Sequence, residues 1–285
     1  MNIGIVGLGL LGGSFSLGMR SVEEGHRYIG VDINPENARL ALELGIADEI
    51  REYGEMLQIA DLIVLATPVN VILRQLSTSL DGMRDDAVLI DFGSTKEAFC
   101  RSVESHPRRS RYVACHPIAG TENSGPESAF AGLLRHKQMI LCDRDRSDSE
   151  VLYFVEHLFM RLEMRISYMD PAEHDRHIAY VSHLSHISSF ALGLTVLEKE
   201  KDERSIFTMA GSGFSSTVRL AKSAPDMWAP IFSQNTANVS KALEASIRML
   251  VEFNEVIDQA DETRSHDLMQ RANDIRRILH GIDGR

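Results

Sequence analysis

Residues 1–12 read MNIGIVGLGLLG, and this stretch decides how the N-terminal half of the chain folds. An apolar run of strand type leads directly into Gly7, Gly9 and Gly12, and the helix-like segment LGGSFSLGMR follows. At this spacing the first glycine permits a tight turn, the second lets a pyrophosphate approach the backbone, and the third lets the helix pack against the strand. The stretch therefore predicts a strand–turn–helix unit that binds a dinucleotide at the helix N-terminus. The predicted binding residues are Gly7, Leu8, Gly9, Leu10, Leu11 and Gly12.

A carboxylate stands where such a unit contacts ribose. Asp32 ends the second apolar run, YIGVD, and lies twenty residues after Gly12. It can accept hydrogen bonds from both ribose hydroxyls, and it would repel a 2′-phosphate. Since no Arg or Lys follows in DINPEN, the sequence favours NAD over NADP.

Composition limits the class of protein. The 285 residues are 44% hydrophobic and 25% charged, which is typical of a soluble globular protein with two domains. No run of eighteen apolar residues occurs and no basic leader precedes the first strand, so we expect a cytoplasmic protein without a membrane span or signal peptide. A net charge of −11 disfavours nucleic acid and anionic membranes as partners, and an anionic substrate would need local cations.

The three cysteines indicate reduced thiols. Cys100, Cys115 and Cys142 are odd in number and lack the spacing of a zinc site or disulfide framework. Cys115 adjoins His116, but a buried strand residue is the simpler interpretation than a nucleophile.

Apolar runs alternate with helical patterns up to about residue 169. Short β-rich runs without polar alternation predict a doubly wound parallel sheet covered on both faces. Ligands in such sheets bind beyond the carboxyl ends of the strands. The residues at these ends are Thr67 and Pro68, the stretch 93–96 and the stretch 116–122.

From Pro171 the pattern becomes helical, with helices expected over about 172–200, 227–258 and 261–280. Long helices rich in Ala, Ser and Leu often pack against a partner chain. We therefore predict an α/β fold with a Rossmann-type, NAD-binding domain over 1–169. An all-α domain over 170–285 is expected to bind substrate and form a homodimer.

His116 is the strongest catalytic candidate. It follows a strand at the binding edge, where a neutral imidazole could take the proton of a hydroxyl while a hydride leaves the same carbon. Ser94, one strand earlier, could hydrogen-bond the same hydroxyl or the imidazole, and it could also cap the helix that begins near Lys96.

Four histidines lie close together in the helical half, at positions 174, 177, 183 and 186. At 100° per residue, His174 and His183 point in opposite directions, as do His177 and His186, so one regular helix cannot gather all four. We expect no metal, although a His pair with a distant carboxylate could bind zinc. The alternative is that His183 and His186 face the cleft and bind a polar group of the substrate.

The ordered motifs resemble those of the prephenate and arogenate dehydrogenases of tyrosine biosynthesis. They are GLGLLG at the N-terminus, DFGSTK at 91–96, HPIAGTENSGP at 116–126, SHLSH at 182–186 and GFSSTVRLAKSAPDMW at 213–228. The resemblance covers essentially the whole chain. It implies oxidative decarboxylation of prephenate to 4-hydroxyphenylpyruvate, with hydride passing to NAD and no metal involved.

The resemblance also implies roles for individual residues. His116 would accept the ring hydroxyl proton with help from Ser94, and Arg219 would bind a substrate carboxylate. Trp228 would reach a neighbouring subunit's site. The residues implied to contact substrate are Ser182, His183, His186, Arg219, Glu122 and Trp228.

Two departures from the family pattern affect these expectations. Ser215 and Ser216 stand where many members carry an Arg-Asp pair, so an ion-pair network would be absent or rebuilt through Glu122. Ser185 replaces a usual proline, which predicts a less kinked helix. Preference for prephenate or arogenate stays open, and inhibition by tyrosine would have to act at the active site.

Two other functions remain as alternatives. One is a dehydrogenase of a small hydroxy acid, which would normally place a lysine on the long helix, but residues 172–197 contain none. The other is a dinucleotide sensor without catalysis, which would leave the combination of His116, Ser94 and Arg219 unexplained.

Overall fold

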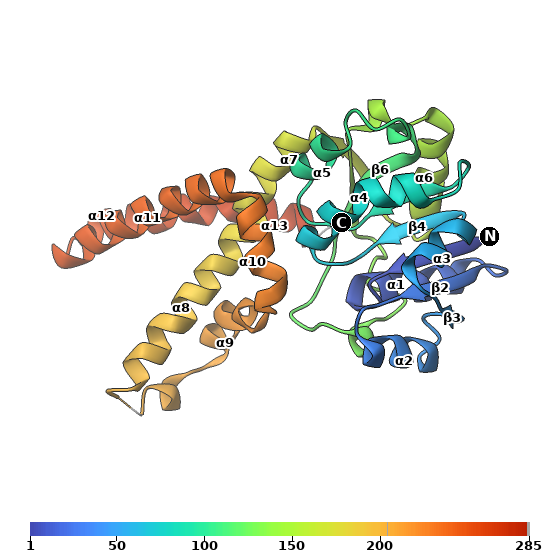
Figure 1. Ribbon diagram of the computed structural model, residues 1–285. Helices are drawn as coiled ribbons and strands as arrows, with labels where there is room; N and C mark the ends of the chain where they lie inside the picture. The colour runs from blue at the N-terminus through green and yellow to red at the C-terminus, as the bar shows by residue number, and fades with distance from the viewer. Residues whose placement is uncertain (204, 284–285) are drawn as a thin grey trace. The chain divides into compact units, whose positions relative to one another are not determined.

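The computed structural model describes residues 1–203 and 205–283, and Figure 1 traces the chain from blue to red. Contacts divide it into two compact units, residues 1–236 and residues 237–285. The first unit contains an eight-stranded sheet in the order β3-β2-β1-β4-β5-β6-β7-β8. In that order the strands are β3 (Glu49–Ile50), β2 (Arg27–Val31), β1 (Asn2–Val6), β4 (Leu62–Leu65), β5 (Val88–Asp91), β6 (Tyr112–Ile118), β7 (Gln138–Cys142) and β8 (Arg165–Met169).

Both faces of this sheet are covered by helices. Successive strand residues point to opposite faces, so Leu62 and Val64 join one apolar cluster while Ile63 and Leu65 join another. The first cluster includes side chains of α1 (Leu10–Val22), α2 (Pro35–Glu43) and α6 (Ser149–Arg161). The second includes side chains of α3 (Tyr53–Ile59), α4 (Val69–Gly82) and α5 (Glu97–Ser102). The predicted doubly wound α/β sheet is confirmed.

The sheet departs from the all-parallel expectation at one strand. β7 runs antiparallel to β6, while every other neighbouring pair is parallel. β6 pairs with β5 only over residues 112–114, whereas its pairing with β7 continues to Ile118. One side of β6 is therefore unpaired from Cys115 onward, at the edge where β5 ends.

The helical part of the first unit follows β8. Asp170 caps α7 (Pro171–Ile178), since its carboxylate accepts the N–H groups of Ala172 and Glu173. A π-helical turn, Ala179–His183, joins α7 to α8 (Leu184–Glu200), so the predicted helix over 172–200 is continuous but not regular. Then come α9 (Ser212–Val218), a 3₁₀ turn (Arg219–Lys222) and α10 (Pro225–Gln234).

The predicted helix over 227–258 is broken in two. α10 ends at Gln234, and α11 (Thr236–Asp258) begins after Asn235. The side-chain amide of Asn235 donates to the carbonyl of Asp175 at 2.7 Å, and this buried contact fixes the chain at the break.

The second unit consists of most of α11 followed by α12 (Glu262–Ala272) and α13 (Arg276–Asp283). Asp261 caps α12 through the N–H of Arg264. α11 exposes Ile247, Leu250, Val251 and Ile257, which at 100° per residue lie on one side of the helix, while the exposed Met249 lies on the other. Within residues 1–203 and 205–283, no helix is long and apolar enough to cross a membrane.

Candidate active site

The glycine-rich loop between β1 and α1 has the geometry that its spacing predicts. Gly7 adopts φ +92°, and a Cβ there would lie 2.7 Å from the carbonyl oxygen of Ala66. A Cβ on Gly12 would lie 2.1 Å from the carbonyl oxygen of Gly7, so the helix could not approach the strand this closely. A Cβ on Gly9 would meet nothing nearer than the Gly125 nitrogen at 4.0 Å. The loop thus has open space at Gly9, next to the N-terminal N–H groups of α1.

No side chain caps α1, and its first turn contains no acidic residue. Its first N–H groups have no partner within the helix, and the helix dipole favours an anion there. These features fit the pyrophosphate of a dinucleotide. Leu8 is fully buried, whereas Leu10 and Leu11 are partly exposed at the start of α1.

Asp32 lies at the end of β2 beside this loop, but it is not free. Its carboxylate accepts the N–H of Leu8 and the N–H of Asn34, both at 2.9 Å. The Asn37 amide donates weakly to Oδ1 at 3.5 Å, but Oδ2 keeps a second lone pair, so Asp32 can hold the loop and still accept a ribose hydroxyl.

Thr67 and Pro68 lie at the end of β4, as predicted. The Thr67 hydroxyl donates to Gln75 at 3.2 Å, and Pro68 directly precedes α4. A Cβ on Gly7 would also touch Thr67, which places this residue against the glycine-rich loop.

His116 lies within β6 rather than after it. It pairs with Ile140 of β7, and the antiparallel pairing extends the strand past the point where β5 ends. His116 nevertheless lies at the carboxyl edge of the parallel strands, where ligands of such sheets bind. The residue is 8% exposed.

His116 is connected to a second histidine and a carboxylate. Its Nδ1 lies 2.8 Å from Nε2 of His174, and Nδ1 of His174 lies 2.7 Å from Asp175. Asp175 also accepts the N–H groups of Lys96 at 2.8 Å and Glu97 at 3.0 Å. This carboxylate from α7, and not Ser94, therefore supplies the N-terminal hydrogen bonds of α5. Our expectation that Ser94 caps this helix was wrong.

Burial keeps the histidines of this cluster neutral. It lowers the pKa of His116 well below 6.5, and the charges of His174, Lys96 and His183 lower it further. Burial also lowers the pKa of His174, although Asp175 opposes this shift. The pKa of His183 falls to about 4, again because of burial. A neutral His116 has one nitrogen free to accept a proton.

The expectation that His174 and His183 point apart was also wrong. Both are buried, and both act electrostatically on His116. The 100° rule assumes a regular α-helix, but the π turn Ala179–His183 changes the phase between the two residues. His177, which is 57% exposed, lies outside the cluster.

His186 and Trp228 extend the site. Their rings stack at 3.5 Å with an interplanar angle of 26°, and the His183 ring lies 6.0 Å from Trp228 in an edge-on arrangement. Nδ1 of His186 donates to the carbonyl of Ser182 at 3.0 Å, which leaves its Nε2 as acceptor. Trp228 thus packs on two histidines of its own chain.

Arg219 forms an ion pair with Glu122. The distance from Nη1 to Oε2 is 2.7 Å, and the Arg219 side chain is 50% exposed. The charge of Arg219 contributes to lowering the pKa of His186, so the pair adjoins the histidine cluster. The rebuilt ion pair through Glu122 that the sequence suggested is present.

A buried ion pair, which the sequence analysis missed, lies beneath His116. Lys96 and Asp91 contact each other with no exposed side-chain surface, and Nζ of Lys96 donates to the Cys115 carbonyl at 2.7 Å. Asp91 accepts the Tyr112 hydroxyl at 2.6 Å and the Gly93 N–H at 2.8 Å. An acidic residue ending an apolar strand, with a lysine five residues later, was the signal for this pair.

Several buried polar atoms near the site find no hydrogen-bond partner within the described residues. They are Ser94 Oγ, His183 Nε2, Trp228 Nε1 and Gln234 Nε2. Gln234, which we did not anticipate, accepts the Thr95 hydroxyl at 2.7 Å and so lies beside the Ser94 loop. Because an unpartnered buried group is costly, this concentration indicates a surface for a polar ligand.

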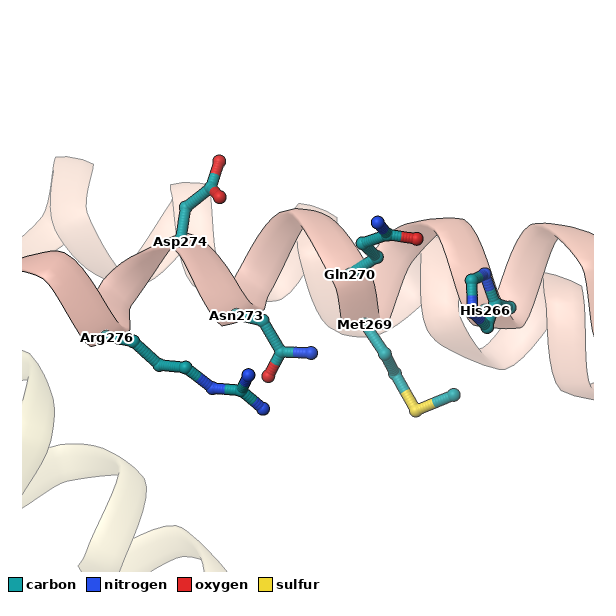
Figure 2. Close-up of a pocket in the computed structure, with 6 residues that line it drawn as sticks. All are labelled: His266, Met269, Gln270, Asn273, Asp274 and Arg276. Atoms are coloured by element: carbon teal, nitrogen blue, oxygen red, sulfur yellow. The ribbon is translucent and has the colours of Figure 1, made fainter.

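A hollow in the second unit lacks a cluster of buried polar side chains like the one around His116. It is lined by His266, Met269, Gln270, Asn273, Asp274 and Arg276, all from one helical run (Figure 2). His266 lies 3.7 Å from Asp267, and both side chains are at least 70% exposed. Such exposed groups are not held in one geometry, so the first unit contains the candidate site.

The cysteines and acidic residues do not suggest other chemistry. All three thiols are free and buried, and burial raises the pKa of Cys115 well above 9.0, so it is no nucleophile. Within the described part of the chain, no group of three or more His, Cys, Asp or Glu residues is arranged to hold a metal.

Known protein families match nearly the whole chain. The nucleotide-binding domain of prephenate dehydrogenase matches residues 15–168, and its dimerization domain matches residues 170–271. The prephenate dehydrogenase of Bacillus subtilis is 29% identical over 95% of this chain and 74% of its own length.

Solved structures agree with this match. Prephenate dehydrogenase from A. aeolicus, in complex with hydroxyphenyl propionate and NAD+, is 32% identical with a TM-score of 0.89 and coverage of 98% of each chain. Synechocystis arogenate dehydrogenase is 29% identical with a TM-score of 0.77, over 98% of this chain and 100% of that one. The chain belongs to the prephenate dehydrogenase family.

Proposed function

We propose that this chain oxidises and decarboxylates prephenate, using NAD as the hydride acceptor and His116 as the base. The observation that carries the proposal is the neutral His116, held through Nδ1 at the edge of a nucleotide-binding sheet. The A. aeolicus relative, which binds NAD+ and hydroxyphenyl propionate, supports the cofactor and a phenolic product.

The glycine-rich loop and Asp32 would hold NAD, which when bound accepts a hydride from the ring carbon that carries the hydroxyl. Nε2 of His116 takes the hydroxyl proton as that carbon becomes a carbonyl. The carbon–carbon bond to the ring carboxylate then breaks, and its electron pair makes the ring aromatic as carbon dioxide leaves. The phenolate oxygen can recover the proton from His116, so no net proton is released.

The other predicted residues have binding roles in this proposal. The planar guanidinium of Arg219 can bind the side-chain carboxylate bidentately once it exchanges Glu122 for substrate. Ser94 Oγ and His183 Nε2 are buried and have no hydrogen-bond partner in the part of the chain that the structure describes, and both suit polar groups of the ligand. Ser182 fixes the ring of His186 through its carbonyl.

The proposal includes the division into domains and a homodimer. Residues 1–169 would bind nucleotide, and residues 170–285 would complete the substrate site and form the dimer. The matched dimerization domain and the exposed apolar side of α11 support this assembly.

Arogenate is the second candidate substrate, because the Synechocystis arogenate dehydrogenase is similar over the whole chain. Prephenate and arogenate differ in the side chain, keto acid or amino acid, and not at the reacting ring. The same base and hydride chemistry would serve both. Tyrosine, which resembles the product, would compete at this site.

The test is NADH or NADPH formation with prephenate or arogenate and NAD or NADP in all four pairings. We expect turnover with prephenate and NAD, lost by about 10²- to 10⁴-fold in His116→Asn, while NAD still binds by calorimetry. Activity only with arogenate would keep the mechanism and change the substrate. No turnover in any pairing would contradict the proposal and favour a non-catalytic sensor or a hydroxy-acid dehydrogenase.

A further inference from the structure

We propose that Asp175 is a positioning residue: anchored on the N-terminus of α5, it sets the tautomers of His174 and His116 so that His116 presents an unprotonated Nε2. The inference rests on the proposed function only in treating Nε2 of His116 as the catalytic base. The arrangement of hydrogen bonds itself is independent of the substrate.

The anchor consists of backbone groups that can only donate. The N–H of Lys96 donates to one oxygen of Asp175 at 2.8 Å, and the N–H of Glu97 donates to the other at 3.0 Å. The carbonyl of Asp175 in turn accepts the Asn235 amide at 2.7 Å. With both side-chain oxygens acting as acceptors, the carboxylate is fixed in place and orientation.

The direction of the remaining hydrogen bonds follows from this anchor. The carboxylate accepts from Nδ1 of His174 at 2.7 Å, so that nitrogen carries the hydrogen. A neutral His174 then has a bare Nε2, which must accept from Nδ1 of His116 across their 2.8 Å contact. His116 therefore carries its hydrogen on Nδ1, and only its Nε2 can act as the base.

The surroundings keep both rings neutral. The charged or titratable groups that act on His116 and His174 are Lys96, Asp91, Asp175 and His183. Burial lowers the pKa of both histidines, so at neutral pH each ring has one hydrogen to place. When His116 takes a proton, Asp175 also offsets the new positive charge through His174.

The experiment reads the tautomers directly. Protein labelled with ¹⁵N-histidine and free of substrate is compared by NMR with Asp175→Ala, using the ring nitrogen resonances. We expect hydrogen on Nδ1 of both His116 and His174 in the parent protein, and a mixture of tautomers in the variant. Turnover should fall by about 10²- to 10⁴-fold in the variant, with NAD affinity kept.

Asp170→Ala is the matched control. The Asp170 carboxylate also accepts two backbone N–H groups at the start of α7, those of Ala172 and Glu173. We expect it to cost about 1 kcal/mol of stability, as loss of a helix cap does, and to leave tautomers and turnover unchanged.

Two further variants decide the question if Asp175→Ala does not fold. His174→Gln can place an amide oxygen opposite Nδ1 of His116, whereas His174→Leu cannot accept, so turnover should be higher in the glutamine variant. Equal turnover in the two, or unchanged tautomers in Asp175→Ala, would overturn the inference. Correct tautomers in a parent protein that turns over no substrate would contradict the proposed function alone.

Discussion

The two nitrogens of His116 have different partners, and this difference explains why a buried imidazole can act as a base. Nδ1 is held by His174, while Nε2 is left for a ligand. The pKa lies well below 6.5, so the ring stays unprotonated across the neutral range. The base is therefore ready without first losing a proton to solvent.

The sequence predicted the site features that depend on local backbone geometry, but not the contacts between residues far apart in the chain. The spacing of Gly7, Gly9 and Gly12 encodes local backbone geometry, which follows from short-range sterics. The contact between His116 and His174 joins residues 58 positions apart, and no local rule specifies it. The sequence analysis noted His174 only as one of four clustered histidines and gave it no role beside His116.

Replacing Ser94 should change activity without lowering stability. Its hydroxyl is buried and has no partner among the described residues, so Ser94→Ala should leave the free energy of unfolding unchanged or raise it. If the hydroxyl binds ligand, kcat/KM should fall by about tenfold, the value of one hydrogen bond.

Ser79→Ala is the control for this comparison, because the Ser79 hydroxyl donates to the Gln75 carbonyl at 2.6 Å within α4. It should cost about 1 kcal/mol of unfolding free energy and leave kcat/KM unchanged. Unfolding in urea and steady-state kinetics measure both quantities. A Ser94→Ala enzyme with full activity would remove Ser94 from the site.

The helix between Pro171 and Glu200 shows how a single turn changes what a segment can do. Its existence and length were predictable from periodicity, but its phase was not. The π turn Ala179–His183 brings His174 and His183 to the same site, although a regular helix would separate them. π turns often occur at functional sites and have no simple sequence signature, which is why this arrangement could not be foreseen.

β5, β6 and the start of α5 are joined by the buried pair of Asp91 and Lys96, whose loss we expect to be severe. Lys96→Met would leave the Asp91 carboxylate buried without a cation, at a cost of about 3–5 kcal/mol in unfolding free energy. The Cys115 carbonyl would also lose its donor, next to His116. Chemical denaturation at pH 7.5 measures the loss.

Two comparisons isolate the buried charge. Asp91→Asn combined with Lys96→Met should recover part of the stability, because no isolated charge remains. Arg101→Met removes a cation from an exposed ion pair on α5 and should cost less than about 1 kcal/mol. A similar small loss in Lys96→Met would show that this pair does not hold the strand ends together.

The charge of the whole chain differs from the charge around the candidate site. The net charge is −11, yet the site contains Lys96, Arg219 and four histidines among its charged or titratable groups. The sequence predicted that an anionic substrate would need local cations, and Arg219 is one. Short apolar runs that alternate with helical patterns predicted the sheet, but the antiparallel β7 was not encoded in any pattern we could read.

The buried histidines should make the whole protein sensitive to mild acid. Burial lowers the pKa of His116, His174, His183 and His186 in the folded chain, whereas the unfolded chain binds these protons near pH 6.5. The contribution of these histidines to the unfolding free energy is therefore fully present above about pH 6.5. It decreases as the pH falls toward their pKa values in the folded chain. For His183, whose pKa is about 4, the loss by pH 4 is about 3 kcal/mol.

Urea unfolding at a series of pH values between 7.5 and 5 tests this, with His183→Asn as the variant. Between pH 6 and 5 the slope of unfolding free energy against pH should decrease by about 1.4 kcal/mol per pH unit when His183 is removed, because one proton fewer is taken up on unfolding. His177→Asn removes an exposed histidine and should leave the slope unchanged. Equal slopes in the parent and His183→Asn would show that His183 binds a proton as readily in the folded chain as in the unfolded one, contrary to its burial among His174, Trp228 and Asn235.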